Sequence, residues 1–125
     1  MKKILTLCLF MLSFLSFTEI SIASTPHSSF NTCAQAVPTA DPGFCPSFKA
    51  VADCHCSENG LPEEVCGDMN ALYQYMLDMF GSMESACAFQ QDTDPQTCID
   101  DWNCYRNGGT NSQGQLCSAS GSACQ

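Results

Sequence analysis

The triplet Cys54-His55-Cys56 contains the residues of this sequence that are best suited to chemistry. Two thiolates and an imidazole are good ligands for zinc or copper. On a helix, however, residues two positions apart point about 200° away from each other, so Cys54 and Cys56 cannot both reach one ion. Cysteines with available partners in an oxidising compartment form disulfides. We therefore predict that Cys54 and Cys56 form two opposed disulfides to neighbouring segments, in preference to a metal site.

The acidic segment 92–103 is a second candidate site, because it partly resembles a calcium-binding EF-hand loop. Its carboxylates Asp92, Asp94 and Asp100 stand where such a loop places oxygen ligands. The glycine at position 6 and the glutamate at position 12 of an EF-hand loop are both missing. The dipeptide Asp94-Pro95 also suits the start of a helix. We favour a capped helix here and keep a weak calcium site at these three aspartates as the alternative.

Methionines and aromatic residues provide a third candidate, a binding surface. Flexible, polarizable methionines on one helix face can form an adaptable groove, although they also fill hydrophobic cores. We expect most of this face to pack in the core and the exposed remainder to bind a partner. The candidate binding residues are Met69, Tyr73, Met76, Met79, Phe80, Met83 and Trp102.

Catalytic motifs are missing from the sequence. The two histidines are His27, near the N-terminus, and His55, between cysteines, and the chain contains neither G-x-S-x-G nor C-x-x-C. Serine hydrolase chemistry needs a positioned imidazole, and thiol-disulfide exchange typically uses C-x-x-C. We expect a protein that is not an enzyme and needs no cofactor beyond weakly bound calcium.

The methionine face belongs to a predicted long helix over residues 61–90. Its apolar residues are spaced alternately by four and three positions, the pattern of one helix face. Pro62 suits the first helical position, and Gly81-Ser82 is expected to mark a kink or a break into a shorter helix, Met83 to Phe89.

Two further helices are predicted on either side of the long helix. One runs from Pro46 to about Ser57, and the other begins at the Asp94 N-cap. The expected fold is all-α, a small disulfide-stapled bundle of three to four helices around one long Met-rich helix. An extended arm over residues 24–40 precedes this domain, which covers residues 41–125 and ends in an irregular, stapled C-terminal tail.

The first 23 residues are typical of a secretory signal peptide. They combine Lys2-Lys3, an apolar run of about fourteen residues, and the small residues Ser21 and Ala23. The run is too short to span a bilayer, so we expect cleavage after Ala23, no membrane span and no lipid anchor.

Ten cysteines remain after such a cleavage, and an even number behind a signal peptide predicts a framework of five disulfides. The pairing cannot be deduced from spacing. The expected disulfide cysteines are Cys33, Cys45, Cys54, Cys56, Cys66, Cys87, Cys98, Cys104, Cys117 and Cys124.

The net negative charge of the chain limits the classes of partner that it can bind. Residues 24–125 hold two cations, Lys49 and Arg106, against twelve carboxylates. Two cations cannot neutralise a nucleic-acid backbone or an anionic lipid surface, so binding to either is disfavoured. A basic protein, a cation or a neutral apolar ligand is compatible with this charge. The length suits a single domain, which we expect to be a monomer.

The basic start, the small residues Ser21 and Ala23, and ten cysteines on a helical body resemble the small disulfide-rich proteins that Gram-negative bacteria export by type II secretion. This resemblance implies passage through the periplasm, an extracellular destination and, for some such proteins, a role as a virulence factor. We expect a non-catalytic secreted protein that binds a protein or host-surface partner. The alternatives are a carrier of a small apolar or lipid ligand and a weak calcium-binding module.

Overall fold

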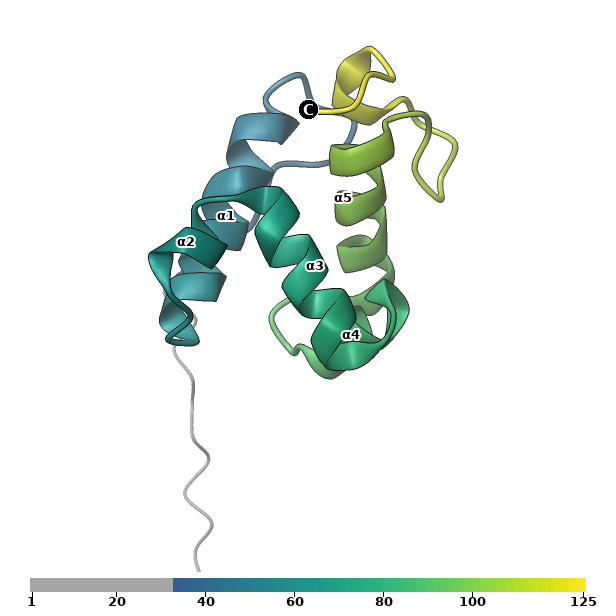
Figure 1. Ribbon diagram of the computed structural model, residues 1–125. Helices are drawn as coiled ribbons and strands as arrows, with labels where there is room; N and C mark the ends of the chain where they lie inside the picture. Colours follow the sequence, from purple (N-terminus) through teal and green to yellow (C-terminus); the bar gives the residue numbers. More distant parts are fainter. Residues whose placement is uncertain (1–32) are drawn as a thin grey trace, which may run out of the picture.

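Helices make up the regular secondary structure of residues 33–125, the part of the chain that the computed structural model describes (Figure 1). Apart from one isolated β-bridge between Thr110 and Leu116, this part contains no β-pairing. The prediction of an all-α, disulfide-stapled fold is therefore confirmed. The helices are α1 (Phe44–Glu58), α2 (Glu63–Cys66), α3 (Met69–Phe80), α4 (Met83–Phe89), α5 (Pro95–Asn107) and the short 3-10 helix η1 (Cys117–Ala119).

The described residues begin at Cys33, within the predicted N-terminal arm. The predicted signal peptide, residues 1–23, and residues 24–32 of the arm lie outside them. From residue 33 to residue 40 the arm contains no helix or strand. The backbone N–H of Val37 donates a hydrogen bond to Ser47 Oγ (3.0 Å), which holds this part of the arm against α1.

The prediction of one long helix over residues 61–90 is wrong, because this segment forms α2, α3 and α4 in succession. The Asp68 carboxylate accepts hydrogen bonds from the backbone N–H groups of Asn70 (2.8 Å) and Ala71 (3.2 Å), so a new helix starts there. Gly81, at φ +78°, ends α3 in the left-handed conformation, and Ser82 Oγ caps α4. The expected break at Gly81-Ser82 and the shorter helix after it are confirmed.

The two flanking helices agree with their predicted positions. Helix α1 begins two residues before the predicted start at Pro46. Helix α5 follows Asp94, whose carboxylate accepts hydrogen bonds from the backbone N–H groups of Gln96 and Thr97, both at 3.1 Å. Asp94 is thus the N-cap that the sequence indicates, with Pro95 at the first helical position.

The core forms where α1, α3 and α5 meet. Phe44 and Phe48 of α1 stack at 5.5 Å between ring centroids, and Phe48 meets the Trp102 ring edge-on at 5.1 Å. Tyr105, one turn after Trp102, packs against Phe48 at 5.5 Å. All four are buried, and Phe44 is fully so. This aromatic cluster fixes α5 against α1.

Five disulfides join all ten cysteines of the described residues. The Cys54 disulfide joins α1 to the arm and the Cys56 disulfide joins it to α2, so the predicted pair of opposed disulfides is confirmed. Cys45, at the start of α1, is bonded to Cys124, and Figure 1 shows the C-terminus beside the first turns of α1. The pairs are Cys33–Cys54, Cys45–Cys124, Cys56–Cys66, Cys87–Cys98 and Cys104–Cys117.

The C-terminal tail packs against α5 through a close backbone approach at Gly108. This residue has φ +66° and ψ −146°, a conformation that is essentially restricted to glycine. A Cβ atom there would lie 2.5 Å from the backbone nitrogen of Ala123 and 2.5 Å from the carbonyl oxygen of Gly121. The backbone N–H of Cys124 donates to the Tyr105 carbonyl (2.8 Å) nearby, so the tail cannot move away freely.

We expect Gly108→Ala to lower the free energy of unfolding by about 3 kcal/mol, through strain together with the clash. Gly60→Ala is the matched control, because Gly60 also has a positive φ (+75°) but nothing lies within 4 Å of an added Cβ. It should cost only about 1 kcal/mol. Urea denaturation with the disulfides intact measures both values, and equal losses would show that the close approach is unimportant.

Candidate functional site

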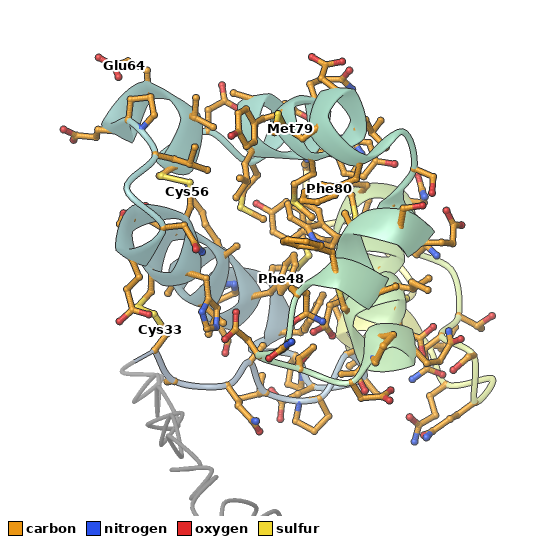
Figure 2. The ribbon with its side chains drawn as sticks, turned by 90° about the horizontal axis from the view of Figure 1, so that it is seen from below. Cys33, Phe48, Cys56, Glu64, Met79 and Phe80 are labelled. Atoms are coloured by element: carbon orange, nitrogen blue, oxygen red, sulfur yellow. A yellow bond between two sulfur atoms is a disulfide. The ribbon has the colours of Figure 1, made fainter. Side chains whose placement is uncertain are left out.

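An apolar cavity of about 610 Å³ lies between α1, α3, α4, α5 and the arm. Met79 and Phe89 line it and are also 61% and 72% exposed, so the cavity opens to solvent beside them. In Figure 2, Phe48 and Phe80 lie in the interior between α1 and α3, whereas Glu64 points outward from α2. Six residues form much of the apolar wall: Phe48, Ala52, Leu72, Met76, Phe80 and Trp102.

Aromatic rings form a large part of this wall. Trp102 and Phe48 are in edge-on contact on the α5 and α1 sides, and Phe80 and Phe89 are 5.0 Å apart on the α3 and α4 sides. Tyr75 adds a fifth ring from α3. Such rings present apolar area and negatively polarised faces to a ligand.

Asp101 is the buried polar residue of the cavity wall. Its side chain lines the cavity, and the residue is only 8% exposed. Burial, and secondly the negative charge of Asp100, raise the pKa of Asp101 from 3.8 to about 7. No hydrogen bond or ion pair found within residues 33–125 involves its carboxyl group. Within the described residues the carboxyl group thus has no protein partner, and its oxygens keep some contact with solvent, because none of the fully buried side-chain oxygens there lacks a hydrogen bond.

Two polar residues meet at another part of the cavity. His55 Nδ1 lies 3.5 Å from Asp92 Oδ2, and both side chains are partly exposed. Gln90, which follows α4, orders the intervening loop, because its side-chain amide bonds the carbonyl groups of Cys87 (2.9 Å) and Thr93 (2.7 Å). No lysine or arginine lines the cavity in the described part of the chain, so an anionic ligand would find no full positive charge there.

The predicted binding residues fall into two groups. Met76, Met79, Phe80 and Trp102 line the cavity, whereas the other three are absent from its wall. Met69 and Met83 are buried in the core. Tyr73 packs against Trp102 at 5.5 Å and under the Arg106 guanidinium at 4.0 Å. The structure thus brings together Met76, Met79 and Phe80 from the C-terminal part of α3 and Trp102 from α5.

The three predicted calcium ligands have separate surroundings. Asp94 caps α5, and Asp92 lies beside His55. Asp100 accepts hydrogen bonds from the backbone N–H and the hydroxyl of Ser112. Their oxygens are not within 4.8 Å of one another as a group. Calcium binding at these residues stays a prediction.

One other group in residues 33–125 has the spacing of a metal site, namely Cys33, His55 and Glu58, whose ligand atoms lie within 4.8 Å of one another. The sulfur of Cys33 is bonded to Cys54. A disulfide sulfur is not the thiolate that zinc or copper binds, so this group has the geometry of a metal site without its donor set.

Asp101, Phe48 and Phe89 are site residues that the sequence analysis did not identify. For Asp101 a signal existed, because it falls three residues after Cys98, one before Trp102 and four before Tyr105. This is the i, i+3, i+4, i+7 stripe that marks the buried face of a helix. A carboxylate on an apolar stripe is rarely buried without a partner. This rule would have marked Asp101 as a candidate site residue.

None of the helices within residues 33–125 has the length and apolar character needed to cross a membrane. Comparisons of the chain with protein-family models, with curated proteins and with solved structures find no significant match to any of them. The geometry of the cavity is therefore the basis for assigning a function.

Proposed function

We propose that this protein is a non-catalytic binding protein whose cavity takes up a small, largely apolar molecule. The observation that supports this function is the apolar cavity of about 610 Å³. Its volume lies within the range of about 300–1,000 Å³ that is typical of small-molecule sites. A predominantly apolar wall with a smaller number of polar side chains is also typical of such sites.

The disulfides support this function by fixing the walls in advance. Cys87–Cys98 joins α4 to α5, and both helices line the cavity. Cys56, which is itself part of the wall, ties the end of α1 to α2. A ligand that enters a preformed site loses less free energy to the ordering of side chains and loops.

Trp102 provides a direct test, because it is the single tryptophan of the chain and lines the cavity. We expect titration with 1-octanol to change its fluorescence and to saturate. Ala52→Phe places a ring in the cavity and should weaken binding by about tenfold or more, since it removes the space for several methylene groups. Ala50→Phe, at an exposed position of the same helix, is the matched control and should bind like the unchanged protein.

Saturable octanol binding that Ala52→Phe weakens and Ala50→Phe leaves unchanged would support the proposal. Equal binding to all three proteins would place the ligand elsewhere, and the absence of saturable binding would refute the function. Circular dichroism of the two variants checks that each remains helical.

A protein partner is the second candidate, and the exposed apolar side chains at the opening favour it. Met79 and Phe89 are more than half exposed, and methionine is common at adaptable binding surfaces. The acidic charge of the chain would favour a basic partner. For both candidate functions we propose that the protein is exported through the periplasm to the cell exterior. Such export agrees with the five disulfides, which form in oxidising compartments.

A further inference from the structure

Asp101 is a mostly buried acidic residue in the wall of the cavity. It is 8% exposed, lines the cavity, and takes part in no hydrogen bond or ion pair within the described residues. Buried carboxyl groups are ordinarily paired or hydrogen-bonded, because desolvation without compensation is costly. The oxygens of Asp101 keep some contact with solvent, so a ligand that supplied a partner would recover the part of that cost that solvent does not already offset.

The chemistry around Asp101 distinguishes between kinds of partner. Trp102, the next residue on α5, and Phe48 of α1 line the same cavity. Aromatic faces attract cations, and the attraction increases when water is excluded. A cavity wall that holds both a carboxylate and aromatic rings is complementary to an ammonium group. Among residues 33–125, neither lysine nor arginine lines this wall, and Asp92 lies at another point of it, so it disfavours a ligand with a carboxylate or phosphate group.

We propose that the cavity selects apolar molecules that carry a protonated amine, with Asp101 as the residue that binds the ammonium group and the rings of Phe48 and Trp102 beside it. This inference rests on the proposed function and deepens it, because it names the chemical class of the ligand. It predicts discrimination by head group among molecules with the same apolar body.

The test compares three eight-carbon probes, octylamine, 1-octanol and octanoate, at pH 8. Octylamine is protonated at this pH, because alkyl amines titrate near pH 10, like a lysine side chain. We expect it to bind more tightly than 1-octanol, and octanoate to bind least tightly. Asp101→Asn should weaken octylamine binding on the order of 10- to 100-fold, the loss typical of a charged hydrogen-bond partner, and should weaken 1-octanol binding much less, because a neutral hydroxyl loses no ion pair.

Glu64→Gln is the matched control, because it removes the same negative charge from an exposed position on α2, where Figure 2 shows Glu64 pointing outward. General attraction of a cation to an acidic protein would weaken in both variants equally. Loss of octylamine binding in Asp101→Asn alone therefore supports Asp101 as the anchor.

The failures of the two proposals can be told apart. If 1-octanol binds but octylamine has no advantage, or if Asp101→Asn keeps that advantage, the ligand class is wrong and the apolar binding function stands. If none of the probes saturates the cavity, both proposals fail together. Isothermal titration calorimetry gives the three affinities for each protein, and circular dichroism checks the fold of each variant.

Discussion

Replacing Cys45 and Cys124 by serine is expected to lower the free energy of unfolding by about 4–5 kcal/mol, one of the two largest effects predicted for this protein. This disulfide joins residues 79 positions apart, the longest separation of the five. On the loop-closure account, a crosslink stabilises the native state by restricting the unfolded chain, and the effect grows with the length of the loop. The loss is a large part of the 5–15 kcal/mol that is typical of a folded domain.

The matched control is the double substitution Cys33→Ser with Cys54→Ser, which removes a disulfide of separation 21. The same account gives a loss of about 3 kcal/mol for it. Guanidinium denaturation monitored by circular dichroism measures both. A loss for the Cys45 and Cys124 pair no greater than that of the control would contradict loop closure as the main source of stabilisation.

Local signals in the sequence were sufficient to predict most helix boundaries. Asp94-Pro95 starts α5, and Gly81-Ser82 separates α3 from α4, as expected. These predictions succeed because a cap is decided by hydrogen bonds between neighbours in sequence. The break before α3 was missed although Asp68 is a good N-cap, because the apolar spacing of the methionine face continues across it. Periodicity identifies a buried face but does not require a single helix.

The cavity and the disulfide pairing depend on contacts between distant segments, and local patterns do not encode these contacts. Ten cysteines predict five bonds, but spacing cannot show that Cys45 pairs with Cys124. The methionine face likewise predicts that its residues are either buried or involved in binding, but it does not show which residue has which role. Met69 is a core residue and Met79 lies at the cavity opening because of how α3 packs against α1 and α5.

Asp101 was the most informative residue that sequence reasoning passed over. Its position on the apolar stripe of α5 could have been read from the sequence, but the lack of a partner for it within residues 33–125 could not. That property depends on which side chains α1 and α3 direct toward it. The titratable groups that share its cavity are His55 of α1, Tyr75 of α3 and Asp92 of the loop before α5, and Asp100 is its neighbour in the chain.

The second large effect is the pH dependence of stability that Asp101 causes. Folding raises the pKa of Asp101 from 3.8 to about 7, so between these pH values the folded protein binds more protons at this site than the unfolded chain. Stability then falls as the pH rises through this range. Below about pH 4 both states are protonated and the group has no effect. Above about pH 7 both are ionised, and the full cost of burying the charge, up to about 4 kcal/mol, is present.

Asp101→Asn should remove this cost while keeping the shape of the side chain. We expect the variant to be about as stable as the unchanged protein at pH 4 and more stable by up to about 4 kcal/mol at pH 8. Urea denaturation at the two pH values measures the difference, and Glu64→Gln controls for the loss of one negative charge at the surface. A stability difference between Asp101→Asn and the unchanged protein that is the same at pH 4 and pH 8 would mean that water solvates the carboxylate. In that case burial would not destabilise the ionised form of Asp101, and a bound ammonium group would have no such destabilisation to offset.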